Sequence, residues 1–181
     1  MKPEMLVRLA ADGSVFCAAE GYKPSSEMKM HLRCYQERED VNGVVHAHPP
    51  VATSYASMGK ALDGYYMTEN ITNLGAVPLA SYARPSTDEV PDSIAPLLQN
   101  HDAVLLANHG ALTVGNTLTK AYFNMESLEM YAKTSMYIHL LGGAPDLSRE
   151  RIDELLDLRE NVYKMSGRHP GYVKYNKKEQ E

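Results

Sequence analysis

The sequence predicts a single α/β domain built around a small sheet. Short apolar runs have the length of strands, and two of them end in histidine, whereas the last third of the chain has helical periodicity. A length of 181 residues is enough for one well-buried core and too short for two comfortable ones. No internal repeat, low-complexity tract or linker divides the chain, so we expect residues 1–181 to form one domain.

Composition narrows the class of protein. A formal net charge of −5 argues against a nucleic-acid partner, because a phosphate backbone requires a basic surface. The two cysteines, Cys17 and Cys34, form no dense framework and indicate a reducing compartment. No apolar run has the length of a membrane span, and the start has no basic region followed by an apolar core. We therefore expect a cytoplasmic protein without a membrane partner.

The first elements are a hairpin and a helix. Apolar runs at 5–9 and 14–19 flank the turn signal Asp12-Gly13 and predict two paired strands, with Cys17 as a small core residue. Serines and a glutamate then open a helix that runs to about residue 37. The spacing of its apolar residues predicts an inner stripe of Met28, Leu32 and Tyr35.

The middle of the chain alternates between strands and helices. We expect a strand that ends at the prolines 49 and 50, followed by a short helix over 51–58. Short strands are expected at 65–67 and 77–79, around a loop at 70–75. A helix from about 85 to 100, which Pro96 kinks or splits, then leads to strands over 103–107 and 111–115.

Two long helices follow. The apolar steps of three and four predict a helix over 117–141, which Gly142-Gly143 ends, and a second helix over about 147–165. The tail beyond Gly167 carries Tyr172 and Tyr175, and we expect its last residues, Lys-Lys-Glu-Gln-Glu, to be mobile.

Histidines at strand ends suggest a metal site. His46 and His48 are two positions apart on a strand, so their side chains share one face about 6.6 Å apart and can reach one ion. The pair alone is a weak signal, but His109 follows another apolar run in the same way. Three imidazoles with one open position are typical of a catalytic zinc site, although other divalent ions accept the same ligands.

Glu27 and the serines before it form a second candidate site. A carboxylate in the first turn of a helix is favoured by the helix dipole, which explains most such glutamates without any function. Backbone N–H groups and the hydroxyls of Ser25 and Ser26 can also hold an anion such as a sugar phosphate at this helix start. Serine caps are common without a ligand, so the residues alone leave both interpretations open.

Together these motifs carry a family resemblance. Pro24-Ser25-Ser26-Glu27 with His31, then Val44-Val45-His46-Ala47-His48, then Leu105-Leu106-Ala107-Asn108-His109-Gly110, resemble the class II aldolase/adducin family in order and spacing. The resemblance extends over nearly the whole chain. It implies a three-layer α/β/α sandwich with a largely antiparallel central sheet, commonly assembled as a C4 tetramer with active sites at subunit boundaries.

The resemblance also implies roles for individual residues. His46, His48 and His109 would be the zinc ligands, Glu27 the catalytic acid/base, and Ser25 and Ser26 part of the phosphate site. Tyr66 would protonate the aldehyde side of the substrate from a neighbouring subunit. The implied reaction is cleavage of a ketose 1-phosphate, similar to fuculose 1-phosphate, into dihydroxyacetone phosphate and an aldehyde through a zinc-stabilised enediolate.

Alternatives within and beyond catalysis remain open. The same metal site serves 4-epimerases, dehydratases and decarboxylases of sugar phosphates, and Glu27 favours aldol cleavage over epimerisation because the epimerases tend to carry aspartate there. A non-catalytic scaffold like the adducin head would lack the metal histidines. The family's N-terminal helix, its Gly-Asn-x-Ser loop and its Thr-Pro-Ser/Thr-Gly turn have no counterpart in this sequence, so we expect an incomplete phosphate pocket.

Overall fold

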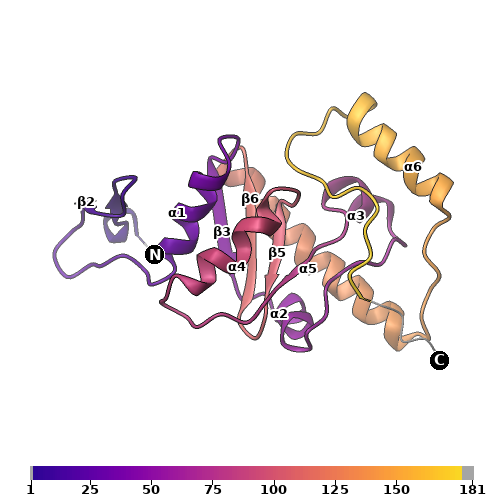
Figure 1. The fold of residues 1–181 in the computed structure, drawn as a ribbon, viewed down its shortest axis with the longest axis horizontal. Coiled ribbons are helices and arrows are strands. Elements are labelled where there is room, and N and C mark those ends of the chain that lie inside the picture. The colour runs from indigo at the N-terminus through magenta and orange to yellow at the C-terminus, as the bar shows by residue number, and fades with distance from the viewer. Residues whose placement is uncertain (1, 177–181) are drawn as a thin grey trace.

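The computed structural model describes residues 2–176 and contains a four-stranded sheet at its centre (Figure 1). The strand order is β3 (Gly43–Ala47), β6 (Gly110–Gly115), β5 (Ala103–Leu106) and β4 (Leu79–Ala80). β6 pairs antiparallel with both β3 and β5, whereas β4 pairs parallel with β5. The edge strand is parallel because a helix connects β4 to β5 and carries the chain back across the sheet. The sheet is therefore mixed.

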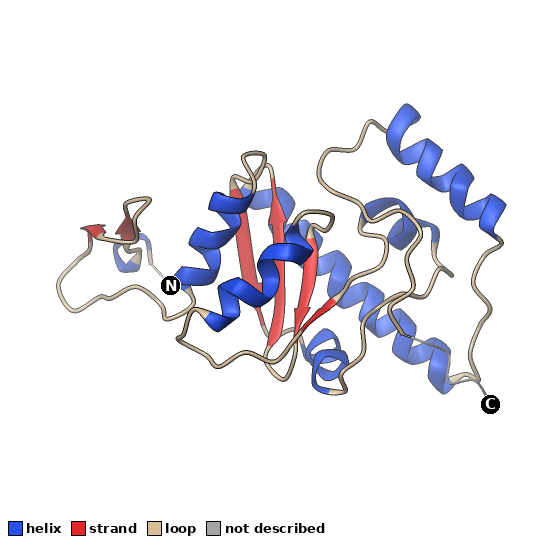
Figure 2. Cartoon of the chain, in the orientation of Figure 1, coloured by secondary structure: helices blue, strands red, loops and turns tan. Residues whose placement is uncertain are grey.

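Helices cover both faces of this sheet (Figures 1 and 2). On one face α1 (Met28–Glu37) and α4 (Glu89–Leu98) pack against a cluster that includes Val104 and Leu106. On the other, α2 (Pro50–Ser57) and α5 (Leu118–Leu140) pack against a cluster that includes Ala103 and Leu105. Successive side chains of β5 thus point into opposite cores, because side chains alternate between the two faces of a pleated strand. The predicted three-layer α/β/α arrangement is confirmed.

The buried face of α1 differs from the predicted stripe. Met30 and Cys34 are the buried residues of the helix, whereas Tyr35 is 44% exposed and Met28 and Leu32 are only half-buried. The spacing of four residues was correct, but the stripe is rotated by two positions. α1 packs along α4 as well as against the sheet, so its buried residues do not follow the single stripe that apolar spacing predicts.

The N-terminal hairpin stands apart from the sheet at the indigo end of the chain (Figure 1). It consists of a short turn of helix at Pro3–Met5 followed by β1 (Arg8–Leu9) and β2 (Val15–Cys17), which pair antiparallel. Asp12 shapes the turn by accepting hydrogen bonds from the backbone N–H and the hydroxyl of Ser14. The prediction of a core position for Cys17 was wrong, because the hairpin lies outside both cores and Cys17 is exposed.

The segment between α2 and α4 contains a helix where a loop was expected. α3 (Thr68–Asn73) occupies most of the predicted loop, and residues 65–67 are not a strand. Leu62 and Val77 form an isolated antiparallel bridge instead. The run of tyrosines at 65 and 66 has strand propensity, but its side chains are used for packing against other segments.

The remaining helices follow the prediction in position more than in length. α4 is continuous through Pro96, which is exposed, as is Asp92, so the carbonyl that loses its partner can bond water. α5 is capped by the Thr117 hydroxyl, which accepts from the N–H of Lys120, and Gly142 follows it with positive φ. α6 (Arg149–Asp157) is continued by a π-helix over Leu158–Val162, so helical backbone ends slightly before the expected residue 165. The tail expected to be mobile, 177–181, lies outside the described residues.

Within the described part of the chain, none of the helices combines the length and apolar character needed to cross a membrane.

Candidate metal centre and surrounding site

Two neighbouring strands bring the three predicted histidines together. His46 lies on β3 and His48 lies one residue beyond its end, where Pro49 precedes α2. His109 lies in the turn between β5 and β6. Because β3 and β6 pair antiparallel with Ala47 opposite Ala111, the end of β3 lies beside the start of β6. The pairing register of β3 with β6, and not proximity in sequence, therefore brings the three histidines together.

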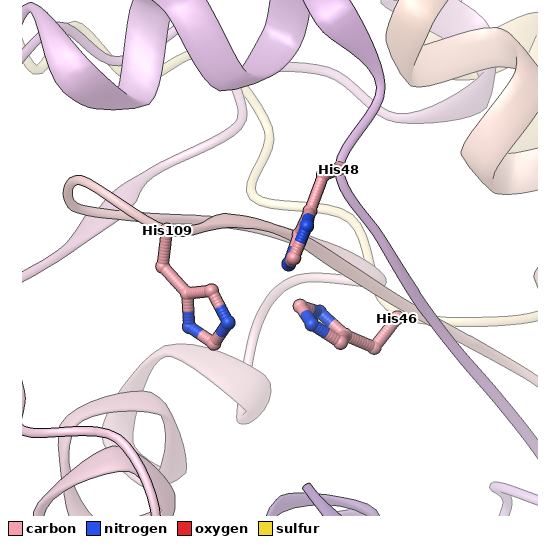
Figure 3. Close-up of side chains that lie close together, drawn as sticks. All are labelled: His46, His48 and His109. Atoms are coloured by element: carbon pink, nitrogen blue, oxygen red, sulfur yellow. The ribbon is translucent and has the colours of Figure 1, made fainter.

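The rings of the three histidines converge (Figure 3). Their centroids are 5.0 Å apart for His46 and His48, 4.8 Å for His46 and His109, and 5.1 Å for His48 and His109. One ring nitrogen from each residue lies within 4.8 Å of the others. Tetrahedral bonds of about 2 Å to a common ion place the ligand atoms roughly 3.3 Å apart, so the three rings would have to close inward around the ion.

The chemistry of His46 fits a metal ligand. Its Nδ1 lies 2.9 Å from the carbonyl oxygen of Ala111, which can only accept, so Nδ1 carries the proton and Nε2 keeps a free lone pair. Burial lowers the pKa of His46, which favours the neutral imidazole that a metal needs. The adjacent His48 and His109 lower that pKa further, while the Ala111 carbonyl opposes the change.

The turn that carries His109 is shaped by its neighbours in sequence. Asn108 adopts a positive φ of 57°, a conformation that asparagine tolerates better than most residues. Gly110 lies against the site so closely that an added Cβ would be 2.5 Å from Cδ2 of His48 and 2.7 Å from the oxygen of Ala47. The sequence motif contains both residues, but their role in shaping the turn was not predicted, although Asn-His-Gly is a turn signal that could have indicated it.

Glu27 lies at the N-terminus of α1, on the side of the histidines. Its carboxylate is close enough to His46 and His31 to raise the pKa of each, against the larger lowering effect of burial. The Ser26 hydroxyl donates a hydrogen bond of 3.3 Å to Oε1 of Glu27, and the Ser25 hydroxyl accepts one of 3.2 Å from the backbone N–H of Glu27. Both serines are exposed. Glu27 is thus near the cluster, with two hydroxyls beside it.

Tyr66 is not beside the three histidines of its own chain. Its hydroxyl donates to the hydroxyl of Ser135 on α5 at 2.8 Å, and burial raises its pKa. It lines a cavity of about 710 Å³ together with Lys60, His139 and Lys174. None of the three histidines of the metal cluster lines this cavity.

The C-terminal tyrosines make structural contacts. Tyr175 donates a hydrogen bond of 2.6 Å to Nε2 of His101, and Tyr172 packs against Tyr65 with ring centroids 4.7 Å apart and ring planes tilted by 44°. His101 in turn donates from Nδ1 to the carbonyl of Leu97 at 2.8 Å. His139 and His169 also bond backbone carbonyls, those of Ser135 and Ile71.

Comparison with known proteins places these features in a family context. A family model described as the class II aldolase and adducin N-terminal domain matches residues 1–136. A 3-oxo-tetronate 4-phosphate decarboxylase from Escherichia coli strain K12 is 34% identical over 150 residues, which cover 80% of this chain and 68% of the relative. A 5-deoxy-D-ribulose 1-phosphate aldolase from Bacillus thuringiensis serovar kurstaki is 34% identical over 157 residues, covering 85% and 71%.

Solved structures agree with the sequence matches. An L-fuculose 1-phosphate aldolase superimposes with a TM-score of 0.78 and 31% identity, covering 87% of this chain and 73% of that structure. The matched proteins carry out different reactions on phosphorylated compounds, so the likeness defines a scaffold and a kind of site before it defines one reaction.

Proposed function

Because the chain belongs to the class II aldolase and adducin family, we propose that it is a cytoplasmic, metal-dependent lyase that cleaves a ketose 1-phosphate into dihydroxyacetone phosphate and an aldehyde. The observation that supports this most is the convergence of His46, His48 and His109. We propose Zn²⁺ as the ion, since three neutral imidazoles with an open position suit it, and other divalent ions could replace it.

The roles of the chain's own residues follow from where charge develops. A divalent ion bound here would supply Lewis-acid chemistry at the substrate oxygens next to the bond that breaks. The imidazoles of the three histidines would hold it, and the carbonyl of Ala111 fixes Nδ1 of His46. Glu27 then moves a proton to or from the substrate carbon, as a general acid and base. Its effect on the pKa of His46 supports this placement.

The start of α1 offers a place for the substrate phosphate. Ser25 and Ser26 precede a helix of ten residues whose first N–H groups and dipole favour an anion. We propose that their exposed hydroxyls contact the phosphate while Glu27 stays on the side of the histidines.

We further propose a homotetramer in which Tyr66 of one copy acts at the metal centre of another. In the described chain, Tyr66 lines a cavity apart from its own histidines, which is the arrangement such sharing requires. A tyrosine whose pKa is raised by burial keeps its proton at neutral pH and can donate it to the aldehyde oxygen in the reverse, bond-forming direction; in cleavage the proton of that hydroxyl leaves by the same route, to the tyrosinate or to water.

A second candidate reaction is decarboxylation of a 3-oxo sugar acid phosphate. The observation that favours it is the decarboxylase relative with 34% identity. Decarboxylation and aldol cleavage both leave electron density on the carbon beside a carbonyl, so the same site would serve both. The following experiment also separates a scaffold, which would hold no metal, from the catalytic alternatives; epimerisation or dehydration would leave metal-loaded protein that releases neither dihydroxyacetone phosphate nor CO₂.

The experiment begins with the metal content of the purified protein. Zinc-loaded protein is then given a panel of ketose 1-phosphates, with release of dihydroxyacetone phosphate as the readout, and a panel of 3-oxo acid 4-phosphates, with release of CO₂. We expect stoichiometric metal and dihydroxyacetone phosphate. CO₂ release alone would favour the second candidate, and protein without stoichiometric metal would contradict both.

Glu27→Gln provides the first mutational prediction. The amide keeps the size of the side chain but cannot take up a proton, so turnover should fall by about 10²- to 10⁴-fold while metal binding stays stoichiometric. Glu39→Gln, an exposed glutamate beyond the far end of α1, is the matched control. A Glu27→Gln protein with wild-type turnover would remove Glu27 from the mechanism.

A further inference from the structure

The short helix α2 connects the two segments that carry the histidines of the metal cluster. It begins at Pro50, two residues after His48. Near its other end, the carbonyl of Ala56 accepts a hydrogen bond of 3.4 Å from the N–H of Asn108, the residue before His109. One rigid element therefore touches both the β3 end and the β5–β6 turn, and its placement affects the distance between two of the three imidazoles.

The N-terminus of α2 cannot be capped by its own residues. The N-cap position is Pro49, which has no side-chain oxygen, and the structure records no cap bond from it. Pro50 at the first helical position has no N–H. The N–H groups of Val51 and Ala52 are the donors left without a partner inside the helix, and Ala52 is fully buried. An unpaired donor there would be costly.

A carboxylate from another helix supplies the missing partner. Glu129, on α5, accepts from the N–H of Val51 at 3.2 Å with Oε1 and from the N–H of Ala52 at 2.9 Å with Oε2. Its side chain is only 13% exposed, and Lys133 lies 3.6 Å away as a counter-charge. Both oxygens of a negative group thus meet the positive end of the helix dipole.

We propose that Glu129 is a positioning residue of the metal centre, which sets where His48 stands relative to His46 and His109. This inference rests on the proposed function, because it requires that the three histidines bind an ion. His48 is joined to the capped turn only by Pro49 and Pro50, whose fixed φ angles leave little freedom to absorb a shift. A displacement of the first turn of α2 is therefore transmitted to the His48 ring.

A purely structural cap would have a different signature. α2 is also held to α5 by Ala52 and Ala56, which are fully buried in the cluster on that face of the sheet. The helix should therefore persist without Glu129, with its first turn free to move. Global stability would then change modestly, while the geometry at the ion would change clearly.

The experiment compares Glu129→Ala and Glu129→Gln with Glu126→Ala as the control. Glu126 lies one turn earlier on α5, is exposed and bonds Tyr122, not α2. The affinity for Zn²⁺ is measured by competition with a chromophoric chelator, and the visible spectrum of the Co²⁺-loaded protein reports coordination geometry. We expect Glu129→Ala to weaken Zn²⁺ binding by about 10- to 100-fold and to change the Co²⁺ spectrum.

Glu129→Gln should restore most of the affinity, because its amide oxygen can still accept from Ala52, and Glu126→Ala should match the wild type. If Glu129→Ala binds Zn²⁺ as tightly as the wild type with the same Co²⁺ spectrum, the inference is wrong, whatever happens to its melting temperature. If Glu129→Ala does not fold, Glu129→Gln decides: its amide nitrogen cannot accept from Val51, so an affinity about threefold below the wild type is expected, and wild-type affinity would overturn the inference. Wild-type protein that binds no metal would instead overturn the proposed function.

Discussion

Gly110 shows how a single residue controls the metal centre. It is the first residue of β6 and follows His109 directly, and His48 packs where its side chain would be. The carbonyl of Ala47 closes the same space from the β3 side at 2.7 Å from an ideal Cβ. Backbone on one side and a ligand ring on the other leave no flexible group that could give way. Glycine is therefore required by space and not by its backbone angles.

Replacing Gly110 with alanine should displace the His48 ring or part β3 from β6. We expect a loss of about 1–3 kcal/mol in the free energy of unfolding, as for other over-packed sites, and at least a tenfold weaker affinity for Zn²⁺. Urea unfolding and chelator competition measure the two effects. Gly21→Ala is the control, because it strains the backbone without crowding: Gly21 has a positive φ of 85°, but no atom lies within 4 Å of an added Cβ. Equal metal affinity in the Gly110 variant and the wild type would contradict the spatial argument.

The candidate site was predictable from sequence only in part. His46, His48 and His109 could be identified because each follows an apolar run, and strand geometry then gives their direction. Glu129 could not, since it is separated from its partners by 77 and 78 positions and meets them only through the packing of α5 on α2. On sequence alone it is one more glutamate on a long helix.

At the scale of elements, α1 and β5 differ in how well they could be predicted. β5 is apolar throughout and buried on both faces, so its pattern leaves one interpretation. α1 contacts the sheet on one side and α4 on another, and two contact faces blur a stripe defined by apolar spacing. Salt bridges from Lys29 and Arg33 to Asp88 and Asp92 of the α4 region occupy the second face. Short elements such as α3 have too few residues to show a period.

The buried line of α1 can be tested by paired truncations. Met30 is 1% exposed and lies in the core beneath α1 and α4, whereas Tyr35 is 44% exposed. Met30→Ala should lower the free energy of unfolding by about 2–5 kcal/mol, while Tyr35→Ala should change it by about 0.5 kcal/mol or less. Urea unfolding of both variants and the wild type gives the comparison. A larger loss for Tyr35→Ala would restore the stripe first predicted from the sequence.

At the scale of the whole molecule, the C-terminal segment fastens distant parts of the chain together. Tyr65, 1% exposed, bonds the backbone of Gly171 and Val173, and Asp63 accepts from the N–H groups of Tyr175 and Asn176. These contacts join residues more than 100 positions apart, and they were invisible to sequence analysis, which saw only two tyrosines in a tail. Figure 1 shows this yellow segment running beside α3.

His169 makes the contacts of the C-terminal segment sensitive to pH. Its Nε2 lies 2.7 Å from the carbonyl of Ile71 on α3, and its Nδ1 accepts from the N–H of Gly171 at 3.1 Å, so one nitrogen donates, the other accepts, and the ring is neutral. Burial lowers its pKa to about 4, and the charge of Arg159 acts in the same direction. An unfolded chain has a histidine pKa near 6.5. Between these two values the unfolded state binds more protons, so stability is complete above pH 6.5 and is lost as the pH falls toward 4.

From pH 7 to pH 5 this residue alone should reduce the free energy of unfolding by about 2 kcal/mol. His31, His46 and His101 also have lowered pKa values and contribute in the same direction, so the wild type must be compared with His169→Gln. Glutamine does not titrate, and its amide can still donate to Ile71. Urea unfolding at both pH values should give a pH-dependent loss about 2 kcal/mol smaller in the variant. Equal losses in the two proteins would mean that His169 accepts a proton in the folded state and that the C-terminal segment tolerates the charge.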